Sequence, residues 1–164
     1  MVSLVLAKLR FTLNGERVSV SAPPAKALLR LLREDFGLTG AKPGCEAGEC
    51  GSCTVLLDGK PVTSCLVLAA QVNGREVTTV EGLDRMGELD NLKLSFASEG
   101  AVQCGYCIPG FVITSYYLLK SNRLKELDSL GKELEGNICR CGGYPKIMAA
   151  VKKAASASGG GKSV

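Results

Sequence analysis

Eight cysteines and no histidine among 164 residues are the feature that most restricts what this chain can fold into. The cysteines form two groups of four, which are Cys45, Cys50, Cys53 and Cys65, and then Cys104, Cys107, Cys139 and Cys141. Without histidine the chain cannot build a Rieske centre, a Cys₂His₂ zinc site or a histidine-based catalytic triad. Acid–base catalysis by histidine would have to take place on another chain, and no catalytic residue is predicted in this one.

The beginning of the chain does not favour a secreted protein with disulfide bonds. Residues 1–7 are apolar, but the run is short, and Lys8 and Arg10 follow it, whereas a secretory signal has its positive charges first. No twin-arginine pair lies near the start, and no apolar run reaches the roughly 20 residues that cross a membrane. We therefore expect a cytoplasmic protein without a membrane partner, in which the clustered cysteines bind metal.

The hydropathy pattern divides the chain into a β-rich first half and a helical second half. Short alternating segments and the hairpin signals Asn14-Gly15 and Asp58-Gly59 predict several strands around one helix at residues 25–36. In the second half, helical periodicity predicts helices near residues 89–102, 109–118, 124–134 and 145–155. The expected fold class is therefore an α+β domain followed by an all-α domain.

A change of composition near residues 80–86 predicts the boundary between the two domains. We expect the α+β domain at residues 1–82 and the helical domain at residues 83–155. Residues 156–164 are rich in serine, glycine and lysine, so a disordered tail is expected there.

The first cysteine group has the spacing of a plant-type [2Fe–2S] ferredoxin. Three cysteines follow the pattern Cys-x₄-Cys-x₂-Cys, and eleven residues separate Cys53 from Cys65. Gly44, Gly48 and Gly51 let the backbone approach a cluster closely and turn its amides toward sulfur. A structural zinc site is the alternative, but zinc ligands usually come as two close pairs. The spacing therefore predicts a [2Fe–2S] cluster.

The second cysteine group is less specific. It joins a Cys-x₂-Cys pair to a Cys-x-Cys pair, with 31 residues between them. This arrangement fits one site with four thiolates, but on spacing alone zinc binding and a thioredoxin-like redox pair stay open. The redox pair is disfavoured because no βαβ pattern surrounds Cys104 and Cys107.

The net charge does not point to a nucleic-acid partner. The formal charge is +4, but each oxidised [2Fe–2S] cluster with four thiolates carries a charge of about −2. Two such clusters would bring the protein close to neutrality, so binding to nucleic acid is not expected.

Three motifs together resemble those of a known protein family. They are KPGCEAGECGSCTV at residues 42–55, QCGYCIPG at residues 103–110 and GNICRCGGY at residues 136–144. Their order, and their use of all eight cysteines across about residues 4–152, is similar to the small iron–sulfur subunit of the xanthine oxidase family of molybdenum hydroxylases. This family includes aldehyde, carbon monoxide, xanthine and 4-hydroxybenzoyl-CoA oxidoreductases.

The resemblance implies a fold and cofactors. The first domain would be a β-grasp ferredoxin fold that binds a [2Fe–2S] cluster through Cys45, Cys50, Cys53 and Cys65. The second would be a four-helix bundle that binds another through Cys104, Cys107, Cys139 and Cys141. Gln103 and Cys141 would also contact a molybdopterin, expected in its cytosine dinucleotide form, on a large partner subunit.

The resemblance also implies a role in a complex of three subunit types, which could itself dimerise. Electrons would pass from the molybdopterin to the second cluster, then to the first, and then to FAD on a medium subunit. The large subunit would select the substrate, and an aldehyde is the expected class. Two positions depart from the family pattern: Ile108 stands where threonine is common, and Asp90-Asn91 replaces a common His-Pro pair.

Several alternatives stay open beside this interpretation. An autonomous soluble ferredoxin could use the same two clusters, although a free shuttle has little need of a helical domain that buries one of them. Without its motif, Gln103 would be interpreted as a polar residue at the end of a helix. Arg140 could offset cluster charge or simply be exposed, and Tyr106 and Tyr144 are expected to pack around the second cluster.

Overall fold

The first half of the chain forms a five-stranded sheet with the strand order β2-β1-β5-β3-β4. The structure is a computed structural model that describes residues 5–121 and 129–159. The strands are β1 (Ala7–Leu13), β2 (Glu16–Ala22), β3 (Thr54–Leu57), β4 (Lys60–Thr63) and β5 (Glu76–Thr78). β1 runs parallel to β5, and the other neighbours pair antiparallel. Asn14 and Gly15 adopt left-handed conformations between β1 and β2, so the predicted hairpin is confirmed.

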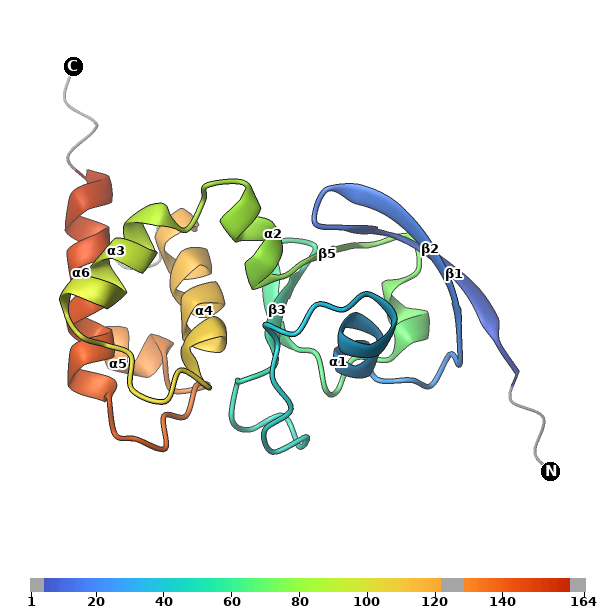
Figure 1. Cartoon of the computed structure of the whole chain (residues 1–164), viewed down its shortest axis with the longest axis horizontal. Coiled ribbons are helices and arrows are strands. Elements are labelled where there is room, and N and C mark those ends of the chain that lie inside the picture. The colour runs from blue at the N-terminus through green and yellow to red at the C-terminus, as the bar shows by residue number, and fades with distance from the viewer. Residues whose placement is uncertain (1–4, 122–128, 160–164) are drawn as a thin grey trace, which may run out of the picture.

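One helical segment packs against this sheet, as the sequence predicts (Figure 1). It consists of α1 (Leu28–Arg30) and η1 (Leu31–Asp35), a π-helical turn that continues it directly, while a short 3₁₀ turn, η2 (Ala69–Val72), follows β4. Leu28, Leu29, Leu31 and Leu32 are buried in the core between helix and sheet. Each such leucine stabilises the fold by roughly 1.5–3 kcal/mol relative to an exposed one.

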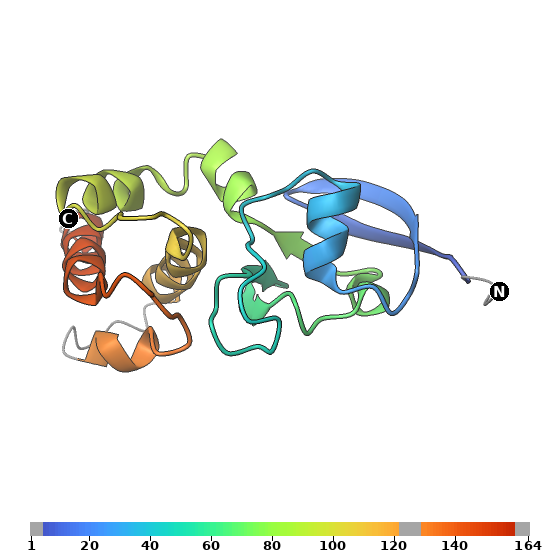
Figure 2. The ribbon, with the colours of Figure 1, turned by 60° about the horizontal axis from the view of Figure 1, so that its bottom comes forward.

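The second half is helical and lies at the other end of the molecule. Its helices are α2 (Val80–Arg85), α3 (Asp90–Ser98), α4 (Ile108–Lys120), α5 (Leu130–Glu133) and α6 (Tyr144–Gly159). Figures 1 and 2 both place α4 next to β3, with α3 and α6 beyond it. The expected order of an α+β domain and a helical domain is therefore confirmed. In the described ranges, no helix is both long and apolar enough to cross a membrane.

The helix predicted at residues 89–102 is shorter than expected. α3 ends at Ser98, and Gly100 follows with φ +57°, a left-handed conformation that commonly terminates helices. Val102 therefore does not continue the buried face of the helix, and 49% of its surface is exposed.

The end of the chain also differs from the prediction. α6 continues to Gly159, so residues 156–159 are helical and do not begin a disordered tail. Alanine-rich sequence favours helix, and the carbonyl of Ala154 accepts a hydrogen bond of 3.0 Å from Asn91 Nδ2 of α3. Residues 160–164 lie outside the described residues, as do residues 124–128 of the helix predicted at 124–134, of which Leu130–Glu133 is observed as α5.

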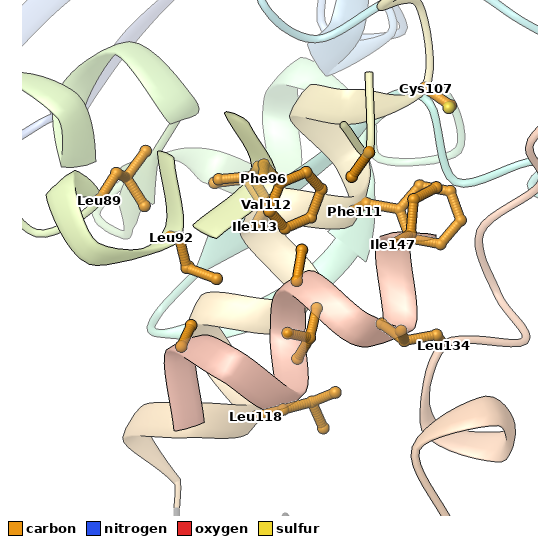
Figure 3. Close-up of a cluster of buried hydrophobic side chains, with 14 of the residues drawn as sticks. Leu89, Leu92, Phe96, Cys107, Phe111, Val112, Ile113, Leu118, Leu134 and Ile147 are labelled. Carbon is orange, nitrogen blue, oxygen red and sulfur yellow. The ribbon is translucent and has the colours of Figure 1, made fainter. Parts of the chain in front are cut away.

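β3 is buried on both of its faces and joins the two domains. Val55 and Leu57 belong to the core between the sheet and α1, whereas Leu56 belongs to the core of the helices. In Figure 3 that second core is formed by side chains of α3, α4 and α6, among them Phe96, Phe111 and Ile147. Because β3 is shared, the two domains pack through a common apolar layer.

The loop before β3 contacts the helical domain through the backbone carbonyl of Gly51. The Gly51 carbonyl accepts a hydrogen bond of 3.2 Å from Asn137 Nδ2, and Asn137 Oδ1 accepts one of 2.9 Å from Thr114 Oγ1. Asn137 is only 4% exposed. A side chain at Gly110, in the first turn of α4, would overlap the Gly51 carbonyl oxygen. Glycine at this position therefore permits the close approach of the two domains.

We expect Gly110→Ala to destabilise the protein by about 1–3 kcal/mol, because the new methyl group must displace the Gly51 backbone. This loss would exceed the gain of about 1 kcal/mol in helix propensity. Urea denaturation of the iron-loaded chain, followed by circular dichroism, measures the change. Gly131→Ala in α5 is the matched control, since its nearest neighbour would be Met148 Sδ at 3.9 Å. Equal stability of the two variants would contradict the proposed role of Gly110.

Candidate metal centres

The first cysteine group lies on the loop before β3 and just after β4. Cys45 is exposed and Cys53 is buried at 2% exposure. The structure brings the Cys45 thiol beside that of Cys50, and the Cys53 thiol beside that of Cys65. One loop thus supplies three of the four thiols, as the spacing predicts.

Backbone amides of this loop point at the sulfur atoms. The amides of Ala47 and Cys50 each donate to Cys45 Sγ at 3.4 Å, and the amide of Cys45 donates to Cys50 Sγ at 3.4 Å. A side chain at Gly44 would begin only 2.6 Å from Cys50 Sγ, so the tight loop requires glycine there. Such amides stabilise negative charge on sulfur, whether in a thiolate or in a cluster ligand.

The thiols of the first group differ in acidity for physical reasons. Hydrogen bonds from the amides of Ala47 and Cys50 lower the pKa of Cys45 to about 7. Burial raises the pKa of Cys53 to about 11. Cys45 is therefore half ionised near neutral pH, whereas Cys53 would become a thiolate at that pH only when a metal ion binds it.

Ser64 fixes the backbone at Cys53, the buried cysteine of the first group, and the sequence did not predict this role. Its hydroxyl donates to the Cys53 carbonyl at 2.6 Å, its amide donates to the same carbonyl at 3.3 Å, and its side chain is fully buried. The only signal in the sequence is its position directly before Cys65.

The second cysteine group lies on two loops that lead into helices. Cys104 and Cys107 precede α4, and Cys139 and Cys141 precede α6. The Cys104 thiol lies beside that of Cys141, and the Cys107 thiol lies beside that of Cys139. The two pairs also interact electrostatically, through Cys104 with Cys107 and through Cys139 with Cys141. The described structure thus places these thiols as two adjacent pairs that interact electrostatically, and their binding of one cluster stays a prediction.

Burial and hydrogen bonds also give the thiols of the second group different pKa values. Burial, followed by the neighbouring Cys139, raises the pKa of Cys107 to about 12. A backbone hydrogen bond from Tyr106 and then the Cys141 side chain hold the pKa of Cys104 below its usual value. The amide of Gly143 donates to Cys139 Sγ at 3.3 Å.

Gln103 and Cys141 lie side by side on the surface. Gln103 Nε2 donates to the Cys141 carbonyl at 3.4 Å, and both residues are exposed. Since α3 ends at Ser98, Gln103 is not at the end of a helix, and that interpretation of the residue is wrong. The arrangement leaves an amide and a thiol available at the same place on the surface.

The two tyrosines beside the second group make specific contacts in addition to packing. Tyr144 packs edge-on against Phe111, and its hydroxyl accepts a hydrogen bond of 2.9 Å from the Cys139 amide. The Tyr106 hydroxyl donates to the Pro43 carbonyl at 2.6 Å and thereby links the two cysteine-bearing loops.

The two cysteine groups adjoin one another. The amide of Ile138 donates to the Cys50 carbonyl at 3.0 Å, so a residue of the first group is bonded to the neighbour of Cys139. A cavity of about 200 Å³ lies between the groups, and its lining includes Cys45, Cys50, Cys104 and Cys107. If each cysteine group binds a redox-active metal cluster, as the sequence predicts, the two clusters would be neighbours and could exchange electrons.

Comparison with known proteins decides between the kinds of metal site. Residues 11–79 match the family described as "2Fe-2S iron-sulfur cluster binding domain", and residues 79–152 match the one described as "[2Fe-2S] binding domain". The nicotinate dehydrogenase small FeS subunit of Eubacterium barkeri is 47% identical over 89% of this chain and 93% of its own length. This chain belongs to the small iron–sulfur subunits of the xanthine oxidase family of molybdenum hydroxylases.

Further relatives of this family agree in sequence and in fold. The xanthine dehydrogenase iron-sulfur-binding subunit of Escherichia coli O157:H7 is 44% identical over 84% of this chain and 87% of its own length. A chain of quinoline 2-oxidoreductase from Pseudomonas putida 86 superposes with a TM-score of 0.87 at 41% identity, covering 96% of this chain and 99% of that chain. The protein is thus an iron–sulfur subunit of an oxidoreductase, and its two domains support [2Fe–2S] clusters.

If each cysteine group binds one cluster, the purified chain should contain about four iron and four labile sulfide ions and no zinc. Cys53→Ser and Cys107→Ser should each lower the iron content to about half, because each removes a ligand from one site only. Metal analysis and EPR of the reduced protein measure this. Circular dichroism must show retained helix, since metal binding and folding are coupled. Loss of all iron in both variants would contradict two independent sites.

Proposed function

We propose that this subunit relays electrons in series between two partner subunits. Electrons enter from a molybdopterin at the cluster held by Cys104, Cys107, Cys139 and Cys141. They then pass to the cluster held by Cys45, Cys50, Cys53 and Cys65, and leave to FAD on a second partner. The chain itself makes and breaks no bond of the substrate.

The hydrogen bond between the Cys50 carbonyl and the Ile138 amide carries this proposal. It connects Cys50 of the first group to Cys139 of the second through one peptide unit and one hydrogen bond of 3.0 Å. Because electron tunnelling weakens steeply with distance, such a short connection favours transfer between the two clusters. A protein with two unrelated structural metal sites would have no need of it.

The surface around Gln103 and Cys141 supports entry of electrons at the second group. The exposed apolar side chains near these residues are Val102, Tyr106, Ile138 and Tyr144. All four stand within three residues of Gln103 or Cys141 in the sequence, and a contiguous exposed apolar patch would mark an interaction site. The Gln103 amide fits a hydrogen bond to a pterin ring, so we assign this surface to a large subunit that holds molybdopterin, expected in its cytosine dinucleotide form.

A second exposed apolar site lies next to the first group. Leu66 and Leu68 are 57% and 44% exposed, and Leu66 follows Cys65 directly. Cys45 is exposed as well. We assign this side to the medium subunit that holds FAD, which gives a complex of three subunit types.

The substrate class expected from the sequence, an aldehyde, stays a prediction. The aldehyde oxidoreductase subunit PaoA of Escherichia coli O157:H7 is 36% identical, and subunits named for nicotinate and xanthine dehydrogenases are 47% and 44% identical. The substrate would bind to the large subunit, so assays of the purified complex with aldehydes and N-heterocycles distinguish these classes.

An autonomous ferredoxin is the competing function. Exposed apolar side chains at both cysteine groups disfavour it, because a freely diffusing shuttle would leave them in water. Purification of the native protein decides the question: co-purification with molybdenum- and flavin-containing chains supports the subunit, and a lone monomer would support the shuttle.

The relay order predicts that replacing a cysteine ligand stops electron transfer at a different step in each of the two groups. In the intact complex with substrate, Cys104→Ser should prevent reduction of both the first cluster and FAD. Cys53→Ser should leave the second cluster reducible while FAD stays oxidised, because the interruption comes later in the path. Rapid-freeze EPR and flavin absorbance measure these steps, with iron content and helicity as controls. Full turnover of Cys104→Ser with an acceptor that draws electrons from FAD would refute the serial order.

A further inference from the structure

We propose that Arg140 supplies a positive charge shared by both clusters and raises the reduction potentials of both. This inference rests on the binding of two clusters and not on the order in which electrons pass through them. It concerns a residue that ligates neither cluster.

The position of Arg140 relates it to both cysteine groups. In the sequence it stands between Cys139 and Cys141, two residues of the second group. In the structure Arg140 also lines the cavity of about 200 Å³ whose wall includes Cys45 and Cys50 of the first group. The arginine therefore borders the space between the two sites, which its place in the sequence alone does not reveal.

The charge of Arg140 is not neutralised within the described parts of the chain. Other cations near the first group have partners: Arg30 pairs with Glu46 at 2.6 Å, and Arg33 and Lys42 donate to backbone carbonyls, with Thr39 accepting from both. Arg140 makes no hydrogen bond or ion pair among residues 5–121 and 129–159. No acidic side chain of these ranges therefore offsets the positive charge of Arg140.

Electrostatics gives the sign of the effect. An oxidised cluster with four thiolates carries a charge of about −2, and reduction adds one electron. A nearby cation stabilises the reduced form more than the oxidised form, which raises the reduction potential. A cation between two clusters also weakens the repulsion between their negative charges. Reduction of one cluster then makes reduction of the other less unfavourable than it would be without the cation. A guanidinium suits this position because it stays protonated and presents five N–H donors to sulfur.

A purely structural role fits the contacts of Arg140 poorly. The side chain is exposed and anchors no element, so its replacement should change stability by no more than about 0.5 kcal/mol. An effect on the clusters would therefore come through charge and would leave iron content unchanged.

The test is a redox titration of the intact complex, monitored by EPR, for the wild type and Arg140→Gln. In Arg140→Gln we expect the reduction potential of each cluster to fall by about 59 mV. For a one-electron reduction this corresponds to a tenfold decrease in the equilibrium constant. Arg140→Lys should restore most of the difference. The shift should become smaller at high ionic strength, as expected for an electrostatic effect at an exposed residue.

Lys146→Gln is the matched control, because it removes the same charge from an exposed residue of the helical domain that does not line the cavity. Lys146 is exposed on α6, with its amine near Gly100. Unchanged potentials in Arg140→Gln, a shift of one cluster alone, or an equal shift in Lys146→Gln would each overturn the inference. A wild-type complex without two reducible EPR signals would instead refute the proposed function.

Discussion

The carbonyl oxygen of Gly51 is the point on which the arrangement of the two domains depends. It accepts hydrogen bonds from the backbone and side chain of Thr54 and from the buried amide of Asn137, and it lies against Gly110 of α4. A buried carbonyl with several donors is costly to displace. The contact holds the loop of the first cysteine group against both loops of the second. The hydrogen bond between Cys50 and Ile138 exists because this approach is possible.

The cysteines differ in how deeply they are buried. Cys53, Cys107 and Cys139 are buried, and burial raises the pKa of Cys53 and Cys107, so the inner thiols are suited to anchor a metal and not to react with solvent. Cys45, Cys104 and Cys141 are exposed. Exposed apolar side chains stand near these thiols in the sequence, and the proposed relay between partners would explain both features together.

Much of the fold was predictable because it follows local patterns. The hairpin at Asn14-Gly15 is fixed by backbone conformation, and α4 (Ile108–Lys120) contains the helix predicted at residues 109–118. Two helix ends were predicted wrongly: Gly100 follows the early end of α3, and α6 continues beyond residue 155 to Gly159. Ser64 and Asn137 were missed because their roles depend on backbone atoms far away in the sequence.

The sequence by itself determined that the chain carries two sets of four cysteines, and the spacing of the first set predicted a [2Fe–2S] cluster, because one loop has to surround a cluster of fixed size. It could not determine how the sets are placed relative to each other. That placement was decided by tertiary structure, through a strand buried on both faces and a carbonyl shared between domains. These contacts join residues such as Gly51 and Asn137, and no local pattern records an interaction between segments so far apart.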